Sequence, residues 1–192
     1  MTNAKATTES LIDGCRRGKE AAMSAFYERF YPYALSVCLA YADNREDARE
    51  LLNDGFMKVF RRIGELKNEA ALNPWLRTIM VNTAIDQYRR TKQAPTVSTE
   101  QIEQVVAEPY QNDEAILAQL SAEHILAVIH RLPSAYRMVF SLYVLEGFSH
   151  RDIADQLHIA ESTSRAHLTE ANRLLRRALL SQTNLPHEQH RR

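Results

Sequence analysis

The chain has 192 residues, 45% of them hydrophobic, and its 24 basic side chains are balanced by 24 acidic ones. A chain of this length can bury one sizeable core or two small ones. It contains no run near the roughly 18 apolar residues that a membrane span needs, and its start lacks the apolar centre of a signal peptide. We therefore expect a cytoplasmic protein with no membrane insertion.

Composition also bounds the fold class and the chemistry. Five glycines and six prolines are separated by long segments with helical periodicity, which predicts an all-α protein. Cys15 and Cys38 lie on apolar faces without a neighbouring cysteine or histidine pair, so we expect buried thiols rather than a disulfide or a zinc site. The seven histidines are scattered rather than spaced as ligands. The sequence predicts no metal site and no cofactor.

Residues 1–94 form the first predicted domain, with 15 basic and 12 acidic side chains. Their apolar periodicity predicts four helices. A short first helix ends at Gly18, and a long second helix is rich in aromatic residues. The four helices are expected near residues 11–18, 22–41, 45–63 and 72–92.

A polar flank distinguishes the third of these helices. Its apolar stripe includes Ala48, Leu52 and Phe56. At helical spacing the opposite flank gathers four polar residues: Glu46, Glu50, Asn53 and Asp54. A flank of this kind is usually only solvated. On a slightly basic domain it could instead dock against a positively charged partner surface.

The fourth helix is apolar nearly all round. Asn73 is predicted as its N-cap, with Pro74 at the favoured first position. Asn82, between Val81 and Thr83, is expected to face away from solvent, with its amide either satisfied by backbone or available to a ligand. Cations near the helix end suit the helix dipole, or they form a basic surface for single-stranded nucleic acid: Arg89, Arg90 and Lys92.

Residues 95–114 differ from the segments on either side. They carry five acidic side chains and no basic one, and they include Pro95 and Pro109. No apolar period is sustained there, so the segment is predicted to be a flexible acidic linker. Two small helical domains, residues 1–94 and 115–192, would flank it.

A helix-turn-helix is predicted in the second domain. Ser149 and Asp152 can form a capping box at the start of a short helix, and residues 158–160 form the turn. In the next helix, small and apolar residues recur on one side. Six residues are left facing outward: Ser162, Arg165, Ala166, Thr169, Arg173 and Arg176. This face can enter the major groove of DNA, and the alternative is an amphipathic hairpin with a solvated face.

Three segments, in this order, resemble a known family. They are residues 48–56 (ARELLNDGF), residues 74–86 (PWLRTIMVNTAID), and the helix-turn-helix preceded by LPSAYR and EGFS. Together they resemble bacterial RNA polymerase sigma factors of the compact, two-domain extracytoplasmic-function class, and the resemblance covers nearly the whole chain. It implies a promoter-specificity subunit rather than an enzyme. The implied partners are core RNA polymerase and promoter DNA, with an anti-sigma factor as a further candidate.

The resemblance also implies what each surface does. Polymerase would dock on the polar flank of the third helix, and the outward face of the last helix would read the duplex minus-thirty-five element. The minus-ten element would be captured as a single strand, with one base flipped into a pocket at Asn82. The loop containing Lys67 and Asn68 would cover that base. Phosphate contacts would come from three arginines: Arg77, Arg89 and Arg90.

Two departures from the family pattern affect the recognition helix. Ala160 stands where a serine commonly caps it, and the lost cap costs about 1 kcal/mol. Glu170 lies at the edge of the DNA-facing side, where a basic residue is more usual. It could accept from a cytosine amino group or pair with Arg173, and the pair is the preferred interpretation.

Two other classes of protein stay open from the residues alone. One is a transcription regulator whose first domain dimerises or senses a ligand; such a protein would bind DNA without polymerase. The other is a helical enzyme. The sequence offers no Gly-rich phosphate loop, no nucleophile with its base, and no carboxylate and histidine pattern on facing helices, which speaks against the enzyme.

Overall fold

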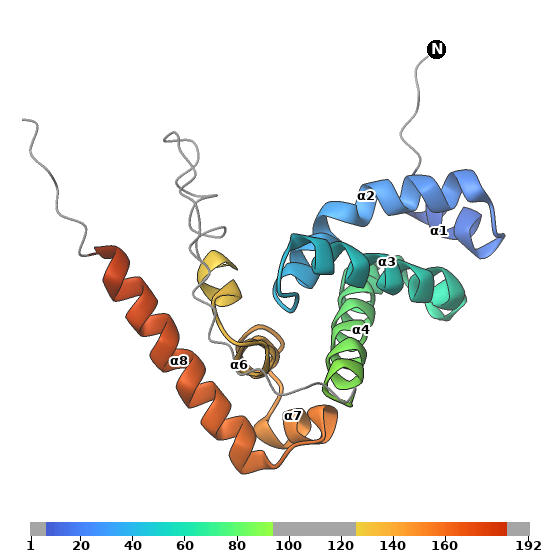
Figure 1. Cartoon of the computed structure of the whole chain (residues 1–192). Helices are drawn as coiled ribbons and strands as arrows, with labels where there is room; N and C mark the ends of the chain where they lie inside the picture. The colour runs from blue at the N-terminus through green and yellow to red at the C-terminus, as the bar shows by residue number, and fades with distance from the viewer. Residues whose placement is uncertain (1–6, 94–125, 184–192) are drawn as a thin grey trace, which may run out of the picture. The chain divides into compact units, whose positions relative to one another are not determined.

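The computed structural model describes residues 7–93 and 126–183, and the chain divides into two units, Met1–Thr96 and Val97–Arg192. Every regular element in the two described ranges is helical (Figure 1), which confirms the all-α prediction. No helix in those ranges is long and apolar enough to cross a membrane. The predicted acidic linker, residues 95–114, lies outside the described residues.

The first unit contains the four predicted helices, in order: α1 (Thr8–Arg16), α2 (Glu20–Leu39), α3 (Arg45–Arg62) and α4 (Leu72–Gln93). Local chemistry sets several of their ends. The Asn44 side chain accepts from the backbone N–H groups of Glu46 and Asp47 at 2.8 and 2.9 Å and so caps α3. Gly18 follows α1 with φ of 67°, a left-handed conformation that favours glycine.

Aromatic and aliphatic side chains from α2, α3 and α4 fill the core of the first unit. The ring centroids of Phe26 and Phe30 lie 4.6 Å apart, and those of Tyr27 and Phe56 lie 4.6 Å apart. Leu76 and Met80 of α4 are also fully buried. Complete burial of one such side chain contributes about 1.5–3 kcal/mol. Packing of the predicted apolar stripes therefore holds these helices together.

Two helix pairs in this unit approach each other at a glycine. A Cβ atom on Gly14 of α1 would overlap the Cβ of Ala22 on α2, and a Cβ on Gly55 of α3 would overlap the Met80 side chain. Gly64, by contrast, faces open space. The α1–α2 and α3–α4 contacts therefore depend on the missing side chains of Gly14 and Gly55.

Both cysteines are buried in this unit, as predicted. Burial raises the pKa of the Cys15 thiol, and it raises that of the Cys38 thiol to about 12. The thiolate form, which reacts and binds metals, is therefore disfavoured at both positions.

The predicted start of α4 near residue 72 is confirmed, but the predicted N-cap role of Asn73 is wrong. A short 3-10 turn, η2 (Glu69–Ala71), runs directly into the helix at Leu72. The Asn68 side chain caps that turn by accepting from the Ala70 N–H at 2.9 Å. Asn73 therefore lies inside the first turn of α4. The capping residue is Asn68, which precedes the 3-10 turn and not α4 itself. The prediction looked for a cap directly before the apolar stripe and therefore chose Asn73.

The described part of the second unit begins with helical residues 126–130. It continues through α6 (Ser134–Phe140) and a π-helical turn, η4 (Ser141–Leu145). The predicted helix-turn-helix follows as α7 (His150–Leu157) and α8 (Glu161–Thr183). The capping box at Ser149 and Asp152 is present, and hydrogen bonds from Ser149 hold the pKa of the Asp152 carboxyl below its usual value. In the turn, His158 adopts a left-handed conformation with φ of 55°.

A buried arginine joins two parts of this unit, and the sequence analysis did not anticipate it. Arg137 of α6 is 2% exposed. Its Nη1 atom donates to the backbone carbonyls of His130 and Leu132 at 3.2 and 2.9 Å. Burial lowers the pKa of the guanidinium to about 10, so it stays charged at neutral pH. These bonds fasten the chain before α6 onto α6 itself.

Candidate functional surfaces

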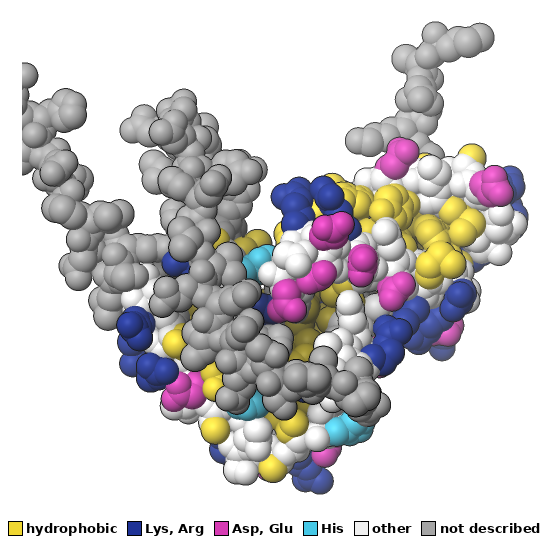
Figure 2. Space-filling view, in the orientation of Figure 1, with side chains coloured by type: hydrophobic (Ala, Val, Ile, Leu, Met, Phe, Trp, Pro, Cys, Tyr) yellow, Lys and Arg dark blue, Asp and Glu magenta, His cyan; other side chains and the backbone are white. Residues whose placement is uncertain are grey.

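The polar flank of α3 is exposed along its whole length, as predicted. Each of its four residues lies at the surface: Glu46, Glu50, Asn53 and Asp54. Figure 2 shows acidic side chains gathered over the part of the first unit that contains α3. The Tyr27 hydroxyl of α2 donates to the Asn53 side-chain oxygen at 3.0 Å, so Asn53 is partly held by its own unit.

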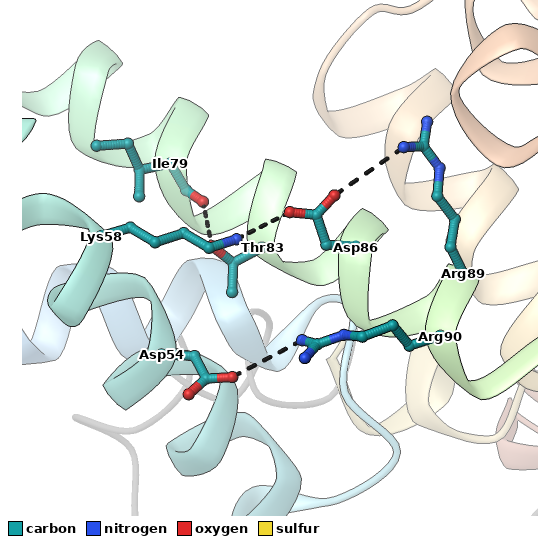
Figure 3. Close-up of polar contacts among 7 residues, drawn as sticks. All are labelled: Asp54, Lys58, Ile79, Thr83, Asp86, Arg89 and Arg90. Carbon is teal, nitrogen blue, oxygen red and sulfur yellow. Dashed lines mark hydrogen bonds and ion pairs between the residues drawn. The ribbon is translucent and has the colours of Figure 1, made fainter. Parts of the chain in front are cut away.

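The expected burial of Asn82 is wrong, because its side chain is exposed. Thr83 is the buried polar residue beside it, and its hydroxyl donates to the Ile79 carbonyl at 2.7 Å (Figure 3). Exposed residues recur at every fourth position along this side of α4, as one side of a helix requires: Thr78, Asn82, Asp86 and Arg90. Asn82 thus lies in the middle of a polar stripe, and its amide can reach a ligand from solvent.

Ion pairs connect this stripe with α3, as Figure 3 shows. Lys58 of α3 pairs with Asp86 at 2.8 Å, and Arg89 approaches the same carboxylate at 4.0 Å. Arg90 pairs with Asp54 at 3.9 Å. The predicted docking flank and the predicted minus-ten surface therefore share an ion pair. Lys58 and Asp86 were missed from sequence, because a contact between helices is set by tertiary packing and not by spacing along one helix.

Exposed pairs of this kind add little stability. In the Arg90–Asp54 pair the two side chains are 67% and 62% exposed, and such a pair contributes about 0–1 kcal/mol. These charges are therefore easily redirected to another partner.

The loop before α4 places both of its predicted residues at the surface. Lys67 and Asn68 are exposed, although the Asn68 side-chain oxygen already caps η2. Arg77, predicted with them as a phosphate contact, lies five residues before Asn82 and is half-buried.

The outward face of α8 is exposed at all six predicted positions: Ser162, Arg165, Ala166, Thr169, Arg173 and Arg176. Arg165 forms an ion pair with Glu161 one turn earlier. Arg173 pairs with Glu170 at 2.8 Å, which agrees with the preferred interpretation of Glu170. The Thr169 hydroxyl donates to the Arg165 carbonyl at 3.0 Å.

A contact between the helices orients this face, and it was missed from sequence. His150, the first residue of α7, lies with its Nδ1 atom 3.0 Å from the hydroxyl oxygen of buried Ser164 on α8. The Tyr143 ring stacks on the His150 ring with centroids 4.6 Å apart. The start of α7 is thereby held against the start of α8, from which the outward face projects.

Comparisons with known proteins match the two units separately. Residues 26–94 match the family described as "Sigma-70 region 2", and residues 122–179 match "Sigma-70, region 4". The chain is 28% identical over 162 residues to "ECF RNA polymerase sigma factor SigM" of Mycobacterium tuberculosis, covering 84% of this chain and 79% of that protein. It is 24% identical over 181 residues to "RNA polymerase sigma-H factor" of Pseudomonas aeruginosa, covering 89% of this chain and 93% of that protein.

One solved structure, titled "Structure of CnrH in complex with the cytosolic domain of CnrY", aligns with 89% of this chain and 96% of that chain. The alignment has a TM-score of 0.44 and 17% identity.

Proposed function

This chain belongs to the extracytoplasmic-function class of bacterial RNA polymerase sigma factors, and from that premise we propose which of its residues contact polymerase and which contact the promoter. A sigma factor directs polymerase to promoters. Family membership favours this assignment over the ligand-sensing regulator, and we infer a non-catalytic subunit that works in the cytoplasm.

Core polymerase docks on the polar flank of α3. The supporting observation is that Glu46, Glu50 and Asp54 are exposed on one side of a helix whose other side is buried. Opposite charge on the partner would speed association and select the correct register. An anti-sigma factor that covered the same flank would block docking, which makes such a protein a further candidate partner.

The exposed stripe of α4 captures the unpaired minus-ten strand. Asn82 supplies an amide donor and acceptor to a flipped base, whose unstacking costs a few kcal/mol that contacts in a pocket offset. Phosphates would meet the nearby arginines, and the loop with Lys67 and Asn68 would cover the base. The accessible amide of Asn82 is the observation that carries this assignment.

The outward face of α8 reads the duplex minus-thirty-five element. Arg165 lies one turn after the start of α8, in the N-terminal part, where recognition helices of this motif contact base edges. Arg173 and Arg176 lie further along the helix and would contact phosphates. Near-neutral net charge limits the affinity of the free chain for DNA, so we assign promoter binding to the complex with polymerase.

The docking assignment is tested by charge reversal. The variant Glu50→Lys/Asp54→Lys should lose binding to core polymerase in a pull-down while keeping its helical circular dichroism, because both side chains are exposed. The control is Glu9→Lys/Glu28→Lys, which makes the same charge change at exposed positions of α1 and α2. Equal binding by the two double variants would remove the α3 flank from the interface.

A further inference from the structure

The loop that enters α4 is an exposed segment between two buried anchors. Leu66 and Leu72 are each 3% exposed. The five residues between them, 67–71, are all exposed. Buried leucines fix where such a loop starts and ends, but they do not orient its backbone. That orientation requires directional contacts, and hydrogen bonds supply them.

Two side chains from the first two helices make such contacts, one at each end of the loop. Arg16 at the end of α1 donates from Nη2 to the Leu66 carbonyl. The Tyr33 hydroxyl of α2 donates to the Asn73 carbonyl at 3.3 Å. Arg16 is itself oriented by an ion pair with Asp13 at 3.2 Å. The two donors therefore hold the backbone on both sides of residues 67–71.

We propose that Arg16 and Tyr33 are positioning residues for minus-ten recognition, because they hold the loop in the orientation in which it covers the flipped base. The proposal rests on the proposed function of that loop. Neither residue belongs to the proposed DNA-contacting set. Arg16 also precedes residue 26, where the match to "Sigma-70 region 2" begins, so α1 would contribute to promoter selection from outside the matched segment.

The expected effect is on selectivity more than on affinity. A loop held in one orientation rejects a wrong base by leaving polar groups unpaired or in collision, whereas a loosely held loop adjusts to it. Loss of one hydrogen bond corresponds to about 0.5–1.5 kcal/mol. Discrimination between the preferred and the wrong base should therefore fall roughly two- to tenfold for each variant.

The test compares variants of the full chain assembled with core polymerase. Arg16→Ala and Tyr33→Phe each remove one donor, and Arg16→Lys keeps the charge and one donor group. Arg17→Ala is the control for lost charge, since Arg17 is the exposed neighbour of Arg16. Tyr31→Phe is the control for a lost hydroxyl on the same helix. The Tyr31 ring packs beside that of Tyr27, with centroids 5.5 Å apart, and not at an end of the loop.

Each holoenzyme selects from a library of single-stranded oligonucleotides randomised over the minus-ten element. Arg16→Ala and Tyr33→Phe should broaden the base preference at one position, and Arg16→Lys should restore part of it. Amide hydrogen exchange of residues 67–71 should quicken in the same variants, with α3 unchanged. A purely structural role would lower binding to all oligonucleotides alike and leave the preference unchanged.

Two results separate the ways of failing. If Arg16→Ala and Tyr33→Phe keep the wild-type base preference, as the two control variants should, the positioning role is wrong while the proposed function stands. If the wild-type holoenzyme itself selects no base at the minus-ten element, the proposed function of the loop is wrong, and the positioning role falls with it.

Discussion

Asn82 is the single residue on which the proposed minus-ten recognition should depend most. It is exposed in the middle of the polar stripe of α4, so truncation should cost little stability. We expect Asn82→Ala to keep core binding and upstream duplex contact, to lose open-complex formation, and to change the preferred base at one minus-ten position. Permanganate footprinting on promoters varied at that element measures both effects. Normal melting with an unchanged preference would remove Asn82 from the site.

Arg165 is the residue that should matter most for the upstream element. Its guanidinium pairs with Glu161 in the free chain and must turn from that carboxylate to reach a base. If the contact is base-specific, Arg165→Ala should weaken binding of the holoenzyme to duplex by about 1–3 kcal/mol. Titration of labelled upstream duplex measures this loss. Arg177→Ala, at an exposed arginine of the same helix that is outside the six predicted residues, is the control and should lose much less.

At the scale of elements, the crossing of α1 and α2 depends on a residue without a side chain. Gly14→Ala would place a methyl group against the Ala22 Cβ, which belongs to a rigid helix, and overpacking of this kind costs about 1–3 kcal/mol. Gly64→Ala meets open space and should be neutral or slightly stabilising. Denaturant unfolding of both variants measures the difference. Equal stability would mean that α1 shifts freely on α2.

The sequence predicted those features of the elements that depend on neighbours along the chain. The Ser149–Asp152 capping box and the apolar stripe of α3 involve residues within a few turns of one another, and both are present. Spacing along α4 misplaced Asn82 because a helix apolar nearly all round leaves the direction of its one solvent-facing side undetermined. Polar residues at every fourth position of α4 mark that side in the sequence. Only the packing of α4 against the other helices shows that this side faces solvent.

Contacts between elements could not be predicted from the sequence for a different reason. Lys58 and Asp86 are far apart in sequence and meet only when α3 lies against α4. Nothing in the residues next to Arg137 predicts that it is buried. It is buried because the backbone at His130 and Leu132 lies against it and accepts its hydrogen bonds. The predictions of the exposed faces of α3 and α8 are confirmed, because an amphipathic helix has only one side that water can reach.

At the scale of the whole molecule, the acidic segment between the domains is expected to follow the positively charged cleft of polymerase. Glu100, Glu103, Glu108, Asp113 and Glu114 lie outside the described residues, so this prediction rests on their charge and on what the resemblance to sigma factors implies. Neutralising all five should weaken holoenzyme assembly or alter release of early transcripts, because the attraction between opposite charges is lost. Abortive-initiation assays measure the second effect. Wild-type behaviour would indicate a passive tether.

The Arg90–Asp54 pair joins a residue of the proposed minus-ten surface to one of the proposed docking flank. If polymerase binds Asp54 as proposed, Arg90 is released for a phosphate, and if DNA binds Arg90, Asp54 is released for polymerase. Binding of either ligand should therefore raise affinity for the other by the same factor, as thermodynamic reciprocity demands. A pair worth at most about 1 kcal/mol limits that factor to roughly five.

The effect of the Arg90–Asp54 pair on affinity for DNA is measurable in the free chain. Asp54→Asn should bind a minus-ten single strand up to roughly fivefold more tightly than wild type at low salt, and the gain should fade as salt screens the charges. Glu50→Gln removes the same charge from the same flank and should gain less. An equal gain in affinity for both variants would mean that only the change in net charge matters, and not the ion pair. A larger gain for Asp54→Asn would mean that the free protein holds part of its affinity for DNA in check until polymerase is bound.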